Sequence, residues 1–172
     1  MAMKLNLVGR ESGQPGQHVE LEEILVKAKR CTKVVKGGKR FSFTALVAVG
    51  NRKGLVGYGK GKAGEVPIAI EKAVKFGQRH LIKVPIKDTT IPHWTEAKYG
   101  ATTVLLRPAC RGTGIIAGSA MRAVLELAGI KDILGKVLGS TNPTNVLKAT
   151  LYALQKLHTK TEWEKLRGGS VI

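Results

Sequence analysis

Acidic residues are scarce in this chain of 172 residues, since 12 Asp and Glu stand against 29 Lys and Arg, a formal net charge of +17. Such an excess repels itself within a fold and points to a polyanionic partner. Aromatic residues make up only 5% of the sequence, whereas glycine occurs 21 times. A hydrophobic fraction of 43% with regular apolar patterns nevertheless excludes a wholly disordered basic tail.

Cysteines are few, and long apolar runs are absent from the sequence. Cys31 and Cys110 are too few for a disulfide framework or a zinc pair, which fits a reducing compartment. Apolar stretches such as Ala45 to Val49 are far shorter than the ~20 residues that cross a bilayer. The first ten residues contain no apolar region of a signal peptide. We therefore expect a soluble, cytoplasmic protein without a membrane partner.

The positive charge is concentrated in one window. Between Lys27 and Lys62 the sequence contains eleven basic residues and no acidic residue, which leaves 18 basic residues beside all 12 acidic ones elsewhere. A solvated protein surface usually mixes both signs of charge. The window therefore predicts a nucleic-acid contact.

The first half of the chain is predicted to fold as β-β-β-α. Residues 20–35 and 41–49 have the pattern of strands, and Lys36-Gly37-Gly38-Lys39 forms the turn between them. A third, glycine-rich strand spans 55–59. Apolar residues then recur at helical spacing from Pro67, which suits the first turn of a helix.

The second half is predicted to fold as β-α-β-α, with elements at 102–106, 117–128, 133–138 and 143–157. Gly129 is expected to end the first helix, and Ser140-Thr141-Asn142-Pro143 starts the second with an Asn or Thr cap. A short strand over Ile82–Ile86 is expected to precede the linker, and either this strand or the region of Tyr99 is expected to join the sheet of the second half. The fold class is therefore α+β, with two small domains joined near residues 86–92. The predicted parts are a flexible arm (1–18), the basic domain (19–86), the second domain (87–166) and a tail (167–172).

Two segments of the basic window are candidate RNA-binding elements. Lysines and arginines flank Gly37 and Gly38 at the hairpin tip, where a missing Cβ lets a nucleic-acid backbone approach closely. The run Gly57-Tyr58-Gly59-Lys60-Gly61-Lys62 offers cations and a ring for stacking on a base. A purely structural reason for its glycines, such as a bulge, is the alternative.

Signals for catalysis are weak. Gly112-Thr113-Gly114 with Gly118 resembles a dinucleotide-binding loop, but the spacing is G-x-G-x-x-x-G, and Asp132 precedes the next strand instead of ending it. The four histidines are scattered and lack metal-ligand spacing. We predict no enzyme activity, cofactor, metal or small-molecule substrate. A dinucleotide-dependent enzyme using Gly112–Gly118 is the alternative from another class.

Several long strings, in order along the chain, resemble the bacterial small-subunit ribosomal protein five family. They are Lys33–Arg40 with Phe41–Leu46, Gly57–Gly59 with Lys62-Ala63 and Glu65–Pro67, Gly112–Gly118, Met121–Glu126, and Gly139–Pro143 with Asn145. The resemblance covers about residues 20–157. It implies an N-terminal domain similar to double-stranded-RNA-binding domains without their first helix, and a C-terminal split β-α-β domain.

The resemblance also implies a function. Members are structural constituents of the small ribosomal subunit that bind 16S rRNA beside ribosomal proteins four and eight. They contribute to subunit assembly, to translational accuracy and to the region where mRNA enters. A free-standing regulator that binds double-stranded RNA shares the first domain only and is a second alternative.

Residue roles follow from the window and from the matching motifs. The resemblance assigns the hairpin role to Thr32, Lys33 and the run Lys36–Arg40, and places Gly112, Thr113, Gly114 and Arg122 against protein four. The chain departs from the family's pattern at Asn51-Arg52 and at Gly64, and both departures change the local charge. The full set of predicted RNA-binding residues is Lys29, Arg30, Thr32, Lys33, Lys36, Gly37, Gly38, Lys39, Arg40, Arg52, Lys53, Tyr58, Gly59, Lys60 and Lys62.

Overall fold

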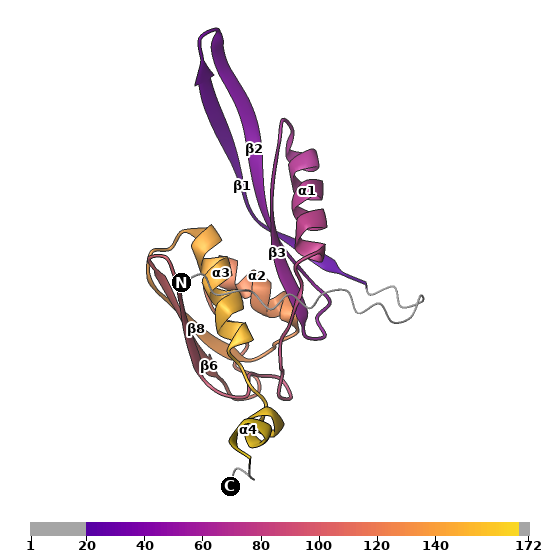
Figure 1. Cartoon of the computed structure of the whole chain (residues 1–172), viewed down its shortest axis with the longest axis vertical. Helices are drawn as coiled ribbons and strands as arrows, with labels where there is room; N and C mark the ends of the chain where they lie inside the picture. The colour runs from indigo at the N-terminus through magenta and orange to yellow at the C-terminus, as the bar shows by residue number, and fades with distance from the viewer. Residues whose placement is uncertain (1–19, 169–172) are drawn as a thin grey trace.

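The computed structural model describes residues 20–168, and the predicted arm 1–18 and residues 169–172 of the predicted tail lie outside them. Two four-stranded sheets carry the fold (Figure 1). The first domain contains β1 (Glu22–Val35), β2 (Gly38–Gly50), β3 (Leu55–Ala63), α1 (Val66–Gln78) and β4 (Ile82–Lys83). The second contains β5 (Thr95–Tyr99), β6 (Thr102–Pro108), β7 (Ile115–Ile116), α2 (Ser119–Ala128), β8 (Ile133–Gly139), α3 (Pro143–Gln155) and α4 (Lys160–Arg167).

The first sheet is antiparallel, with strand order β1-β2-β3-β4, and α1 covers one of its faces. This confirms the predicted β-β-β-α order, and the strand expected at Ile82–Ile86 joins this sheet as the shorter β4. Ala69, Ala73 and Gly77 recur every four residues on α1 and are buried. Such a stripe of small residues lets the helix axis approach the sheet closely, because only short side chains lie between them.

The second sheet has the order β5-β6-β8-β7. Strands β7 and β8 pair in parallel and are connected by α2, so the domain is a split β-α-β unit. The prediction of a strand near Tyr99 is confirmed by β5, whereas Ile82 pairs with Val56 in the first sheet. Gly129 ends α2 in the left-handed conformation. The Asn142 side chain accepts a hydrogen bond from the N–H group of Thr144 at the start of α3, as expected.

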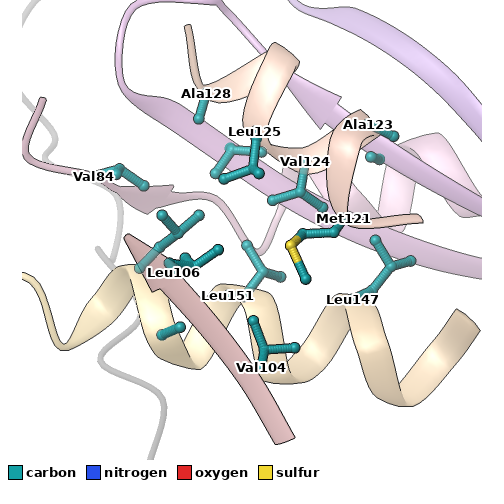
Figure 2. Packing of buried hydrophobic residues seen from close by; sticks show 14 of the residues in the cluster. Val84, Val104, Leu106, Met121, Ala123, Val124, Leu125, Ala128, Leu147 and Leu151 are labelled. Atoms are coloured by element: carbon teal, nitrogen blue, oxygen red, sulfur yellow. The ribbon is translucent and has the colours of Figure 1, made fainter. Parts of the chain in front are cut away.

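One of the two hydrophobic clusters of the described residues is shared by both domains, and the other lies between the first sheet and α1. Alternate residues of β2 face opposite ways, so Ala45 and Val47 pack toward α1 while Leu46 and Ala48 join the core with the second domain. Helix α2 lies between the two sheets and contacts β1, β2 and β3 as well as α3. Figure 2 shows the centre of this core, where residues of α2 and α3 meet strand β6 and Val84. The sequence predicts two domains but does not show this continuity.

Helix α4 was missed by the sequence prediction, which treated the C-terminal region as a continuation of the second domain and a tail. A capping box starts it: the Thr159 hydroxyl accepts from the Glu162 N–H group, and the Glu162 carboxylate accepts from the Thr159 N–H group at 2.7 Å. The signal was present in the sequence as Thr-x-x-Glu. Its eight residues carry no fully buried side chain, so the apolar spacing that reveals longer helices was absent.

Candidate nucleic-acid interface

A two-stranded ribbon projects from the first sheet. Strands β1 and β2 pair as far as Val35 and Gly38, but β3 reaches only Phe43 of β2. Residues 31–42, which we call the basic ribbon, therefore extend beyond the rest of the domain (Figure 1). The ribbon brings together Thr32, Lys33, Lys36, Gly37, Gly38, Lys39 and Arg40 from the predicted set.

The ribbon is built for exposure. Gly37 and Gly38 at its tip have open space where a Cβ would lie, and Gly38 has a φ of 139°. Lys33 lies directly opposite Arg40, and like charges in opposing positions destabilise a strand pair. A polyanion laid against the ribbon removes that repulsion.

Lys29 and Arg30 continue the charge from the ribbon into the sheet. The Arg30 guanidinium lies 4.9 Å from the centre of the Phe41 ring, and Phe41 is 53% exposed. An exposed ring already stacked on a cation can accept a base or a sugar on its open side. Phe41 was not among the predicted RNA-binding residues, although an aromatic residue inside a basic hairpin was the available signal.

The predicted residues Arg52 and Lys53 lie at the opposite end of β2. The Arg52 guanidinium is 2.8 Å from the Glu22 carboxylate and 3.6 Å from that of Glu126. The backbone N–H group of Arg52 donates to the Leu127 carbonyl oxygen. Arg52 therefore joins the two domains, and two carboxylates offset its charge. The structure does not bring this turn together with the ribbon.

The predicted RNA-binding residues of strand β3 lie on both of its faces and differ in their surroundings. Gly59 faces α1, and a Cβ there would collide with the Ala73 carbonyl oxygen, so the structural explanation of these glycines is correct. Tyr58 faces the second domain, where burial raises the pKa of its hydroxyl. It does not offer an open ring for stacking. Lys60 and Lys62 are exposed on the face that Tyr58 shares.

The loop Gly112-Thr113-Gly114 is organised by a carboxylate of the chain itself. Asp132 is buried and accepts hydrogen bonds from the N–H groups of Gly112 at 3.0 Å and Gly114 at 2.9 Å. The Gly114 N–H group, together with Thr89, Gly112 and the charge of Arg111, lowers the pKa of Asp132. The amides that a nucleotide phosphate would need are therefore engaged by the protein.

We expect Asp132→Asn to destabilise the loop at neutral pH, because an amide accepts the two N–H groups more weakly than a carboxylate does. The folded-state pKa of Asp132 lies below its unfolded value, so the stabilisation is complete above about pH 4 and is lost as the pH falls through the folded-state pKa. Thermal unfolding should show a lower midpoint for the variant at pH 7 and a gap that closes in acid. Asp88→Asn, which removes an equal charge from an exposed turn, is the control; an equal gap at both pH values would contradict the assignment.

The residues predicted to contact protein partners are accessible. Gly112 and Thr113 are exposed, and so is Arg122 on α2. Arg122 also lines a hollow beside Ile116 and Lys136, between the start of α2 and strand β8. The open face of the second sheet carries further apolar side chains, including Ile116, which is 54% exposed.

Within residues 20–168, no helix is long and apolar enough to cross a membrane, and no group of three or more His, Cys, Asp or Glu side chains could hold a metal ion.

Comparison with known protein families agrees with this architecture. The model of the ribosomal protein S5 N-terminal domain matches residues 21–85, which contain the first sheet and α1. The model of the ribosomal protein S5 C-terminal domain matches residues 97–167, which contain most of the second domain. The two matches lie in sequence order and together cover most of the chain.

The fold and both matches define a structural protein of the small ribosomal subunit. The chain belongs to the ribosomal protein S5 family. This family is structural and non-enzymatic, and its members associate with the ribosome.

Proposed function

We propose that this chain binds 16S rRNA through the basic ribbon and the neighbouring cations of β1 and β3. The observation that carries the proposal is a projecting ribbon with open glycines at its tip inside a window of eleven basic and no acidic residues. Its cations neutralise phosphates and release counterions. Contacts of this kind fix position on a folded RNA and do not depend on base sequence.

The proposal extends to the place of the chain in the subunit. The ribbon contacts rRNA while the second domain faces protein neighbours, with ribosomal proteins four and eight as the partners that the family suggests. The exposed loop Gly112–Gly114 and Arg122 support a protein contact on that side. In this arrangement the chain contributes to subunit assembly, to translational accuracy and to the path by which mRNA enters, and it remains in the cytoplasm as part of the ribosome.

The alternatives are weaker for structural reasons. A dinucleotide-dependent enzyme would need the Gly112 and Gly114 amides that Asp132 occupies. A free-standing RNA-binding regulator would leave unexplained a second domain that shares its core with the first.

The test combines co-sedimentation and binding. The protein should remain with small subunits after a high-salt wash, and it should bind 16S rRNA saturably, with an affinity that falls linearly in log–log coordinates as salt rises. Loss into the free pool without RNA binding would contradict the proposal. Saturable binding of NAD or ATP would favour the enzyme, and equal affinity for a plain RNA duplex would favour the regulator.

A further inference from the structure

The two faces of the first sheet are chemically different. One face is covered by α1 and buries Ala45 and Val47. On the opposite face the exposed side chains are cations over the whole length from the ribbon to the second domain. This surface, which we call the lysine face, contains Lys27, Lys29, Lys33, Arg40, Lys60 and Lys62.

Strand pairing establishes this arrangement. Residues directly opposite each other in a sheet project from the same face. Lys27 and Lys60 both lie opposite Leu46, while Lys29 and Lys62 both lie opposite Thr44. Leu46 faces the second domain. These four lysines therefore project from the face that α1 does not cover.

A β-bulge places the lysines of β1 there. The register of β1 against β2 shifts between Leu25 and Lys27, and Val26 is the extra residue. Without that residue, every side chain from Lys27 to Val35 would move to the other face, because the side-chain period of a strand is two. The bulge thus brings the cations of β1 and those of β3 to one surface.

Glycines on β3 complete the separation. Gly59 and Gly61 face α1 and permit its close approach, so Lys60 and Lys62 necessarily alternate onto the lysine face. Within residues 20–168, no cation of the lysine face has a carboxylate within ion-pair distance. The sequence contains no acidic residue between Lys27 and Lys62 that could supply one.

The lysine face ends in a groove between the domains. A hollow of about 240 Å³ is lined by Lys27, Lys29, Cys31 and Lys60 on the sheet side and by residues 142–144 of the second domain on the other. A chain that follows the cations down from the ribbon therefore meets a wall formed by the second domain.

We propose that the lysine face is the surface along which a phosphodiester backbone of the rRNA lies, from Lys33 and Arg40 on the ribbon down to the groove between the domains. This inference rests on the proposed rRNA binding and adds which face makes the contact. The part of the opposite face that α1 covers would then lie away from that backbone.

A pair of double variants tests the inference. Lys29→Gln with Lys60→Gln removes two charges from the lysine face and leaves the ribbon tip intact. Lys72→Gln with Arg79→Gln removes two exposed charges from α1 and its C-terminal cap, on the helix-covered side. Filter binding of 16S rRNA should give the first variant a salt slope smaller by about 1.4 to 1.8 and an affinity roughly 25- to 60-fold lower at 0.1 M salt. The decrease in salt slope of the second variant should be less than a third of the decrease in the first variant.

The two cysteines give a readout that needs no substitution. Cys31 lies on the lysine face and is half-buried, whereas Cys110 is exposed in the second domain. Bound 16S rRNA should slow the modification of Cys31 by a small maleimide several-fold and leave Cys110 unchanged.

Equal losses in both double variants, or no protection of Cys31 while RNA is bound, would overturn the assignment of the face but not rRNA binding. Unchanged RNA affinity of the Lys29/Lys60 variant with weaker retention in small subunits would assign the face to an acidic protein neighbour and also overturn it. Absence of any rRNA binding by the unmodified protein would instead contradict the proposed function.

Discussion

Alanine at Lys33, Lys36 and Lys39 together should lower the affinity of the protein for 16S rRNA roughly 100- to 500-fold at 0.1 M salt. Each lysine that contacts a phosphate contributes about 0.7 to 0.9 to the slope of log affinity against log salt, so the slope should fall by about 2 to 3. The three residues are exposed on the ribbon, away from the core, so we expect the variant to keep the fold. Filter binding across a salt series measures both quantities.

The control removes three equally exposed lysines outside the basic window. Replacing Lys83, Lys98 and Lys131 by alanine changes the net charge by the same amount and should alter the salt slope only slightly. If both triple variants lost affinity equally, total charge and not the ribbon would carry RNA binding. Circular dichroism of the variants would confirm that the sheets are retained.

Gly59→Ala should destabilise the protein by about 3 kcal/mol, at the upper end of the usual cost of overpacking a core. The added methyl group would collide with the carbonyl oxygen of Ala73, which belongs to the backbone of α1 and cannot move without shifting the helix. Urea unfolding, compared at constant m-value, measures the change.

Gly64→Ala is the matched control for this prediction. Gly64 lies at the end of the same glycine-rich run, has open space where a Cβ would lie and does not have a left-handed φ. Its replacement should change stability by less than about 0.5 kcal/mol or stabilise slightly. Equal stability of both variants, with weaker RNA binding by Gly59→Ala, would instead show that Gly59 serves RNA approach.

Local patterns predicted most elements because each depends on neighbours in sequence. The strand over 41–49, the Asn142-Pro143 start of α3 and Gly129 at the end of α2 all appear as expected. The alternation in 41–49 predicts a half-buried strand, but Ala45–Val49 is buried on both faces because the second domain covers the face opposite α1. The two-residue strand β7 was beyond prediction, because so short a segment has no period and is stabilised only by pairing with β8.

The candidate site was predictable in composition but not in arrangement. The acid-free window identified the ribbon, yet Arg52 within the same window proved to be paired with Glu22 and Glu126, one of which comes from the second domain. Tyr58 likewise faces the shared core. Lys27 was counted in the window but not chosen as a site residue, and its position follows only from the strand register and the groove between the domains.

The sequence by itself determined that a strong positive charge lies on a hairpin and a glycine-rich strand, and it determined the order of the elements in both domains. Only the tertiary structure decided which way those charges face. The reason is that the side-chain period of a strand is two, so the single extra residue at Val26 reverses the orientation of all that follows in β1. Packing of Gly59 and Gly61 against α1 directs Lys60 and Lys62 of β3 to the same face as the lysines of β1. Because the window contains no acidic residue, this face is continuously basic.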